Sequence, residues 1–203
     1  MPINVNNIAS ILIPMLTGGQ NNVAPSAPAQ PGQPLPSDSV SIGQAPQAAK
    51  PEPQHKIDGP VQELPQPLEP KKWTVLVYSM ADNNLYQFMQ EDLNEAERIG
   101  GTPNLNLVAM TDHAQAGGGA KIYELQKDDQ PQLHSPVRKD LGNYNMAQKG
   151  ALSEFIQWGM KNYPAENTMV IISDHGAGWK GAGQDETSGG WMTNPMIKAE
   201  LDD

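Results

Sequence analysis

Three short apolar runs, each followed by polar residues, constrain the fold of this 203-residue chain more than any other feature of its sequence. The runs cover residues 73–80 (WTVLVYSM), 105–110 (LNLVAM) and 168–173 (TMVIIS). Continuous apolar runs of this length, rich in β-branched and aromatic residues, are typical of strands that are buried on both faces. Helical patterns lie between the runs, and this alternation indicates a mostly parallel sheet flanked by helices. The sequence therefore predicts an α/β fold.

The first helix is expected directly after the first strand. Leu85, Met89, Leu93 and Ala96 recur at helical spacing, and two glycines at positions 100–101 end the pattern. This helix would cover one face of the predicted sheet.

Three further elements are expected along the rest of the chain. A second helix should begin near Asn145 and end before Pro164, where its stripe of apolar residues ends. Residues 120–125 suggest a smaller strand after a glycine-rich loop. Residues 197–203 look like the start of a last helix, whose apolar face would lack a partner.

Composition divides the chain near residue 72. Every Trp, Tyr and Phe lies at or after Trp73, whereas 14 of the 19 prolines lie at or before Pro70. A segment without aromatic residues that is rich in Pro, Gln and Ala cannot bury enough apolar surface to offset the entropy of ordering it. We therefore expect residues 1–72 to be a long disordered tail or propeptide-like linker, and residues 73–203 to form one domain.

An apolar stretch at residues 8–16 (IASILIPML) is about half as long as a membrane-spanning helix. It contains Pro14 and lacks the preceding Lys or Arg of a signal peptide. We therefore expect no transmembrane segment and no convincing signal peptide, and the location of the protein stays open.

Charge and cysteine content exclude several functions. The formal net charge of −10 argues against a nucleic-acid partner, because binding to phosphates needs a cationic surface. The chain has no cysteine, so it can form no disulfide, no thiolate metal site and no cysteine nucleophile of its own.

Polar residues that follow the three strands are the candidates for a functional site, because chemistry in parallel sheets lies at the carboxyl ends of the strands. These residues are 79–84, 111–113 and 174–179. The strongest candidate is His175, whose imidazole follows a buried strand and precedes Gly176 and Gly178, where a ligand could approach the backbone closely. The alternative is a loop histidine that only contacts Asp174 or solvent.

The same glycines also fit a dinucleotide-binding fingerprint. Gly176, Gly178 and Gly181 have the spacing G-x-G-x-x-G after a strand. However, that fingerprint must open a helix that holds a pyrophosphate, and the sequence after Gly181 (AGQDETSGG) has poor helical propensity. We therefore do not expect a nucleotide site here.

Two strands end in Asp-His, at residues 112–113 and 174–175, and together these pairs could bind a divalent metal. The simpler interpretation, which we favour, is that Asp112 orients loop backbone while His113 is exposed. The residues at 82–84 (Asp-Asn-Asn) could likewise contact a ligand, but we expect them to cap the first helix. No G-x-S-x-G sequence is present to suggest a serine nucleophile.

Six segments, in this order, resemble the amino-terminal part of clostripain-type cysteine peptidases, which belong to the caspase-like clan CD. The segments are residues 72–85 (KWTVLVYSMADNNL), 91–95, 140–146, 155–159, 163–166 and 173–179 (SDHGAGW). The resemblance runs from about residue 71 to residue 201, and the order and spacing of the segments make it more specific than any single motif.

This resemblance implies a caspase-like fold and a thiol endopeptidase that acts on peptide or protein substrates. It implies that His175 is the catalytic histidine and that the backbone N–H of Gly176 contributes to an oxyanion hole. In the family the histidine works with a cysteine at the end of the next strand, and this chain contains no such segment. We therefore expect residues 73–203 to be a partial peptidase domain that is inactive alone, with the cysteine supplied by a second chain or a carboxy-terminal segment.

Other family properties transfer less directly. Relatives are commonly exported. Calcium dependence in the family makes Asp185 and Glu186 candidate calcium ligands, although no calcium-binding loop is recognisable. Members are often cut between the histidine and cysteine segments, for which Lys180 is a plausible site, but we favour a truncated reading frame. The alternative functions are a non-catalytic caspase-like binding module and, third, a metal-dependent hydrolase.

Overall fold

The computed structural model describes residues 8–14, 57, 69–113 and 119–202. Most of the segment that was predicted to be disordered, residues 1–72, lies outside these ranges, so that the predicted division at residue 72 stays a prediction.

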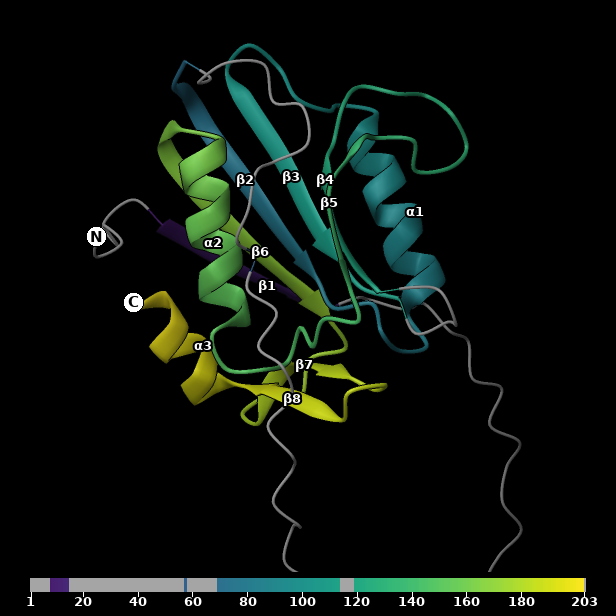
Figure 1. Ribbon diagram of the computed structural model, residues 1–203, viewed down its shortest axis with the longest axis vertical. Helices are drawn as coiled ribbons and strands as arrows, with labels where there is room; N and C mark the ends of the chain where they lie inside the picture. Colours follow the sequence, from purple (N-terminus) through teal and green to yellow (C-terminus); the bar gives the residue numbers. More distant parts are fainter. Residues whose placement is uncertain (1–7, 15–56, 58–68, 114–118, 203) are drawn as a thin grey trace, which may run out of the picture. The chain divides into compact units, whose positions relative to one another are not determined.

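A six-stranded sheet forms the centre of the described structure, with the strand order β1-β6-β2-β3-β4-β5 (Figure 1). The first four strands in this order are parallel, and β4 and β5 continue the sheet as an antiparallel pair. The strands are β1 (Ile8–Pro14), β2 (Lys71–Ser79), β3 (Leu105–Thr111), β4 (Ala120–Glu124), β5 (Val137–Gly142) and β6 (Ala165–Asp174). The prediction of a mostly parallel sheet is therefore confirmed.

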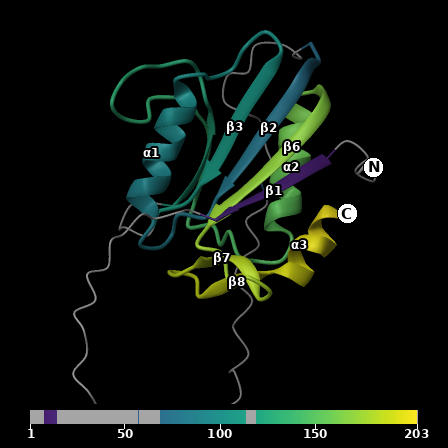
Figure 2. The same cartoon turned by 180° about the vertical axis from the view of Figure 1, so that it is seen from behind.

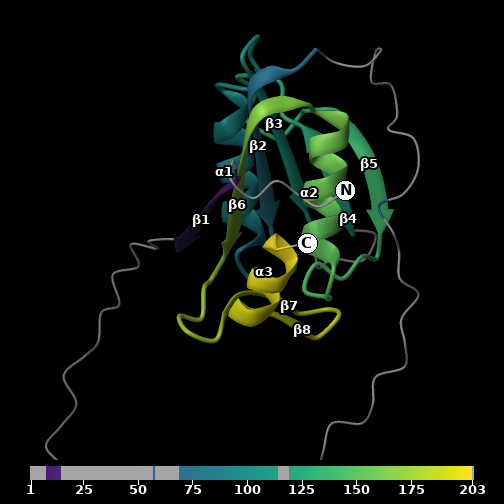
Figure 3. The same cartoon turned by 90° about the vertical axis from the view of Figure 1, so that its left-hand side faces the viewer.

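Two helices cover opposite faces of this sheet, α1 (Tyr86–Glu97) and α2 (Ala151–Asn162) (Figure 3). On the face covered by α2, the buried side chains of Phe155 and Ile156 pack with Leu76 and Val170 of the central strands. On the other face, Leu93 of α1 packs in a smaller cluster with strand residues. Strand β3 is thus buried on both faces, as its continuous apolar sequence predicted, whereas β2 and β6 alternate between buried and partly exposed residues.

A two-stranded hairpin and a short helix complete the described chain. Strands β7 (Gly181–Asp185) and β8 (Gly190–Thr193) pair antiparallel, and α3 (Asn194–Leu201) follows them (Figure 2). Ile197 and Leu201 of α3 pack against the main core. The expectation that the apolar face of this helix lacks a partner is therefore wrong.

Three details differ from the sequence predictions. Helix α2 begins at Ala151 and not near Asn145, because residues 146–150 form turns that end in Gly150 with a left-handed backbone (φ 93°). The strands β1, β5, β7 and β8 were not predicted. In addition, Asp82 and its two neighbours do not cap α1, whose N-cap residue is Leu85, with no capping side chain.

Among the described residues, no helix is long and apolar enough to cross a membrane.

Candidate functional site

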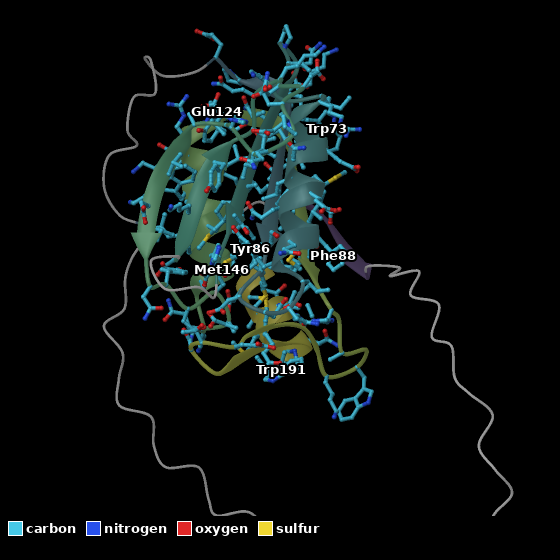
Figure 4. All side chains as sticks on the ribbon, turned by 90° about the vertical axis from the view of Figure 1, so that its right-hand side faces the viewer. Trp73, Tyr86, Phe88, Glu124, Met146 and Trp191 are labelled. Carbon is cyan, nitrogen blue, oxygen red and sulfur yellow. The ribbon has the colours of Figure 1, made fainter. Side chains whose placement is uncertain are left out.

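The carboxyl ends of β2, β3 and β6 meet at the edge of the sheet beside the β7–β8 hairpin (Figure 1). Figure 4 shows Trp191 of the hairpin at this end of the molecule, with Trp73 and Glu124 at the opposite end. All polar residues that the sequence singled out after the strands lie at this edge.

Asp174, the last residue of β6, organises the edge. Its buried carboxylate accepts hydrogen bonds through Oδ1 from the backbone N–H of His175 (2.5 Å) and from Nδ2 of Asn83 (3.0 Å). Its Oδ2 accepts one from the backbone N–H of Gln184 in β7 (2.6 Å). Burial raises the pKa of Asp174, although these hydrogen bonds and the nearby His175 oppose the increase. One carboxylate therefore ties together the ends of β2, β6 and β7.

The hairpin can approach Asp174 this closely because position 183 is glycine. A Cβ atom at Gly183 would lie 2.5 Å from the sulfur of Met80 and 2.6 Å from Oδ2 of Asp174. No side chain larger than hydrogen fits there without moving its neighbours.

The imidazole of His175 is exposed at this edge and contacts the side chain of Asn84. The Nε2 atom of His175 lies 2.7 Å from Oδ1 of Asn84, which is also exposed and follows β2. The two residues are 91 positions apart in the sequence. The backbone N–H of His175 bonds to Asp174 and its ring is exposed, as the simpler alternative from the sequence expected, but the ring also contacts Asn84.

A tight loop follows His175 and leads into the hairpin. The backbone N–H of Gly176 donates to the carbonyl oxygen of Ala182 (2.9 Å), and Nδ2 of Asn194 donates to the carbonyl oxygens of Gly178 (3.1 Å) and Trp179 (3.0 Å). The Trp179 side chain at the tip is 84% exposed. The loop backbone is thus held from both sides while its largest side chain faces solvent.

Three buried carboxylates lie next to this arrangement. Oxygens of Asp82, Asp112 and Asp185 are all within 4.8 Å of one another. Burial raises the pKa of Asp112 to about 7 and that of Asp185 to about 6, and repulsion within the cluster contributes to both increases. The carboxyl groups of Asp112 and Asp185 therefore retain protons at a pH at which an exposed carboxyl is ionised.

Each of the three carboxylates has hydrogen-bond donors of its own. Asp82 accepts from the hydroxyl of Thr187 (2.9 Å), Asp112 from the backbone N–H of His113 (2.6 Å), and Asp185 from that of Ser188 (2.8 Å). Calcium binds to oxygen ligands such as these three carboxylates. Of the two calcium ligands suggested by the sequence, Asp185 belongs to the cluster, whereas Glu186 is exposed and does not.

The structure does not support the other two site interpretations. Gly181 begins a strand and not a helix, so the glycines after His175 cannot form a dinucleotide-binding turn. The two histidines also do not share a metal site: the ring of His113 packs on that of Tyr86, with 3.8 Å between centroids, whereas His175 contacts Asn84. In the described part of the chain, neither histidine lies in a group of three potential ligands.

Sequence reasoning missed the roles of the polar residues after β2. Asp82 binds the hairpin through Thr187, Asn83 binds Asp174, and Asn84 contacts His175. Their position directly after a buried strand indicated a role at the sheet edge. Because Asp and Asn also cap helices, the sequence analysis chose helix capping instead, and that choice was wrong.

Comparison with known proteins identifies the family. A model of the clostripain family matches residues 77–202 of the chain. Clostripain from Hathewaya histolytica is 25% identical over an alignment of 129 residues, and the match covers 53% of this chain and 24% of clostripain. A secreted C11 cysteine protease from Bacteroides thetaiotaomicron, solved in complex with an irreversible peptide inhibitor, is 27% identical. That match has a TM-score of 0.53 and covers 64% of this chain and 38% of the solved one.

These matches show which fold the chain has and how much of each relative it corresponds to. The chain spans about a quarter of the length of clostripain, so that it corresponds to only part of such a protein. The solved protease shares the arrangement of a mostly parallel sheet flanked by helices, which confirms the caspase-like fold. Because the family model matches more than half of this chain, the chain belongs to the clostripain family of cysteine peptidases.

Proposed function

We propose that this chain supplies the histidine half of a cysteine endopeptidase site, and that its 203 residues alone do not hydrolyse peptides. The observation that carries this proposal is the exposed imidazole of His175 at the carboxyl edge of the sheet, on a backbone held by the buried Asp174. The chain has no cysteine, so that the nucleophile must come from another polypeptide segment.

His175 would act as general base and then as general acid. The imidazole takes the proton of a cysteine thiol, and the resulting thiolate attacks the carbonyl carbon of the peptide bond. The protonated imidazole then gives this proton to the departing amine nitrogen as the C–N bond breaks, which leaves an acyl-enzyme for water to hydrolyse. Without the thiolate no acyl-enzyme forms, and residual binding cannot replace it.

Gly176 is the proposed source of one oxyanion-hole N–H. This role requires a change from the structure described here, because the N–H of Gly176 donates to the carbonyl oxygen of Ala182. The carbonyl oxygen of a tetrahedral intermediate carries a full negative charge and is a stronger acceptor than a peptide carbonyl. We therefore propose that the loop after His175 opens at this bond when substrate and the cysteine segment are in place.

Peptides are the proposed substrates, in keeping with the peptide inhibitor bound to the B. thetaiotaomicron relative. The proposed partner is the cysteine-bearing segment, on the same or on a second polypeptide.

The test compares the purified chain with a longer protein from the same gene. Codons after position 203 are read first, and the protein that includes any cysteine-bearing strand is produced together with its His175→Ala variant. The proposal predicts no peptide hydrolysis by the 203-residue chain, hydrolysis by the longer protein that iodoacetamide blocks, and none by the variant. A stop codon after 203 together with a stable monomer would instead favour the non-catalytic binding module.

A further inference from the structure

We propose that Asn84 is a positioning residue that holds the His175 imidazole in one orientation and on one tautomer. Only the expected effect of Asn84 on kcat rests on the proposed function. The contact itself, 2.7 Å between Oδ1 of Asn84 and Nε2 of His175, is independent of any activity.

An amide oxygen can only accept a hydrogen bond, so that Nε2 of His175 must carry the hydrogen in this contact. In the neutral imidazole, the lone pair is then on Nδ1. The acceptor on Asn84 thereby decides which nitrogen is available to take a proton from an approaching thiol, and it restrains the rotation of the ring.

The backbone of His175 and the side chain of Asn83, which precedes Asn84, bind the same buried carboxylate. Oδ1 of Asp174 accepts from the N–H of His175 and from Nδ2 of Asn83, the residue before Asn84. Asn83 further fixes its own turn, because its Oδ1 accepts from the N–H of Leu85 (2.8 Å). The exposed side chains of Asn84 and His175 therefore meet across two restrained backbones, which lowers the entropic cost of their contact.

The neighbouring asparagines separate positioning from folding. Asn83 is buried and binds three groups of the fold, whereas the exposed side chain of Asn84 contacts the His175 ring. Loss of the Asn83 side chain leaves the carboxylate of Asp174 without one donor, and this should lower stability. Loss of the Asn84 side chain should affect the imidazole alone.

The experiment uses the 203-residue chain, isotopically labelled, with the variants Asn84→Ala and Asn84→Asp and with Asn83→Ala as the matched control. Three-bond coupling constants report the χ1 rotamer of His175, and imidazole ¹⁵N shifts at alkaline pH report which nitrogen carries the hydrogen. Thermal unfolding reports stability.

For the original chain and for Asn84→Asp, which keeps the acceptor, we expect one rotamer and the hydrogen on Nε2. For Asn84→Ala we expect averaged couplings and a mixture of tautomers, with an unchanged melting temperature. Asn83→Ala should lower the melting temperature. The proposal is overturned if the original chain shows averaged couplings or the hydrogen on Nδ1. It is also overturned if Asn84→Ala leaves both readouts unchanged or lowers the melting temperature as much as Asn83→Ala does.

Kinetics in a longer protein that contains the cysteine supply a second readout. Asn84→Ala should lower kcat by about tenfold to a hundredfold with KM unchanged, because a misplaced imidazole loses part of the rate enhancement that general acid–base catalysis contributes. Asn84→Asp, which keeps the acceptor, should retain most of the original kcat. A variant with unchanged kcat would contradict the positioning role. If the longer protein itself hydrolyses no peptide, the proposed function fails, whereas the rotamer and tautomer results still decide the role of Asn84.

Discussion

The carboxylate of Glu200 in α3 caps the amino end of α2, where its Oε2 accepts a hydrogen bond from the backbone N–H of Leu152 at 2.9 Å. The same buried carboxylate also accepts from the N–H groups of Gly150 and Ser153. The first N–H groups of a helix have no partner within the helix, and Gly150 at the N-cap has no side chain to supply one. Helix α3 therefore stabilises the layer that covers one face of the sheet.

This cap predicts that Glu200→Ala lowers the free energy of unfolding by about 3 kcal/mol, because three backbone N–H groups lose a charged acceptor. Urea denaturation measures the change. The matched control on the same helix is Lys198→Ala, which removes an exposed ion pair with Asp202 and should cost less than about 0.5 kcal/mol. Equal effects of the two variants would show that the Glu200 cap contributes nothing.

Close packing of the hairpin against Asp174 predicts that Gly183→Ala is destabilising. The added methyl group would overlap Met80 and the Asp174 carboxylate, and overpacking of this kind costs about 2 kcal/mol. Gly101→Ala is the control, because a Cβ at this exposed position meets its nearest neighbour at 3.5 Å. Thermal unfolding of both variants checks the prediction, and a Gly183→Ala chain as stable as the control would contradict the described packing.

The buried carboxylates predict a dependence of stability on pH. Because the pKa of Asp112 is raised to about 7 in the folded chain, the folded state binds more protons than the unfolded state between about pH 4 and about pH 7. Stability associated with this group is therefore fully present below about pH 4 and is lost as the pH rises through about 7.

Asp112→Asn removes this titration and keeps an oxygen that can accept from the N–H of His113. Relative to the original chain, the variant should gain about 2 kcal/mol of stability between pH 5 and pH 8, measured by urea denaturation at both values. Asp140→Asn, at an exposed carboxyl, should show no such gain. If the difference between the Asp112 variant and the original chain is the same at both pH values, the carboxyl is already ionised at pH 5.

The central part of the fold could be predicted from the sequence because it depends on local pattern. Strands β2, β3 and β6 are continuous apolar runs, and α1 shows helical spacing that ends near Gly100. A Cβ at Gly100 would lie 2.2 Å from the backbone nitrogen of Lys127, and its φ of 59° favours glycine. Burial and backbone geometry thus left clear signals in these segments.

The unpredicted elements depend on contacts between distant residues. Strand β5 (VRKDLG) carries three charged residues and lies at a sheet edge, and β7 (GAGQD) and β8 (GWMT) are short and lack a continuous apolar run. The hairpin is held by Asp82 and Asp174, which belong to other strand ends. The start of α2 depends on Glu200, about 50 residues later. No local window of the sequence contains this information.

Only part of the candidate site could be predicted, because one of its features is local in the sequence and the other is a contact between distant residues. His175 could be found because it follows a buried strand and precedes glycines, whereas its contact with Asn84 joins residues 91 positions apart. Nothing in the local sequence separates an asparagine that caps a helix from one that contacts a histidine across the sheet edge.

Peptide hydrolysis by the longer, cysteine-containing protein and by its His175→Ala variant tests the central claim most directly. His175 is exposed, so the substitution should leave the melting temperature unchanged while it reduces thiol-dependent hydrolysis by about a hundredfold or more. A folded His175→Ala protein that cleaves peptides at the original rate would contradict the assignment of this imidazole as the general base and acid.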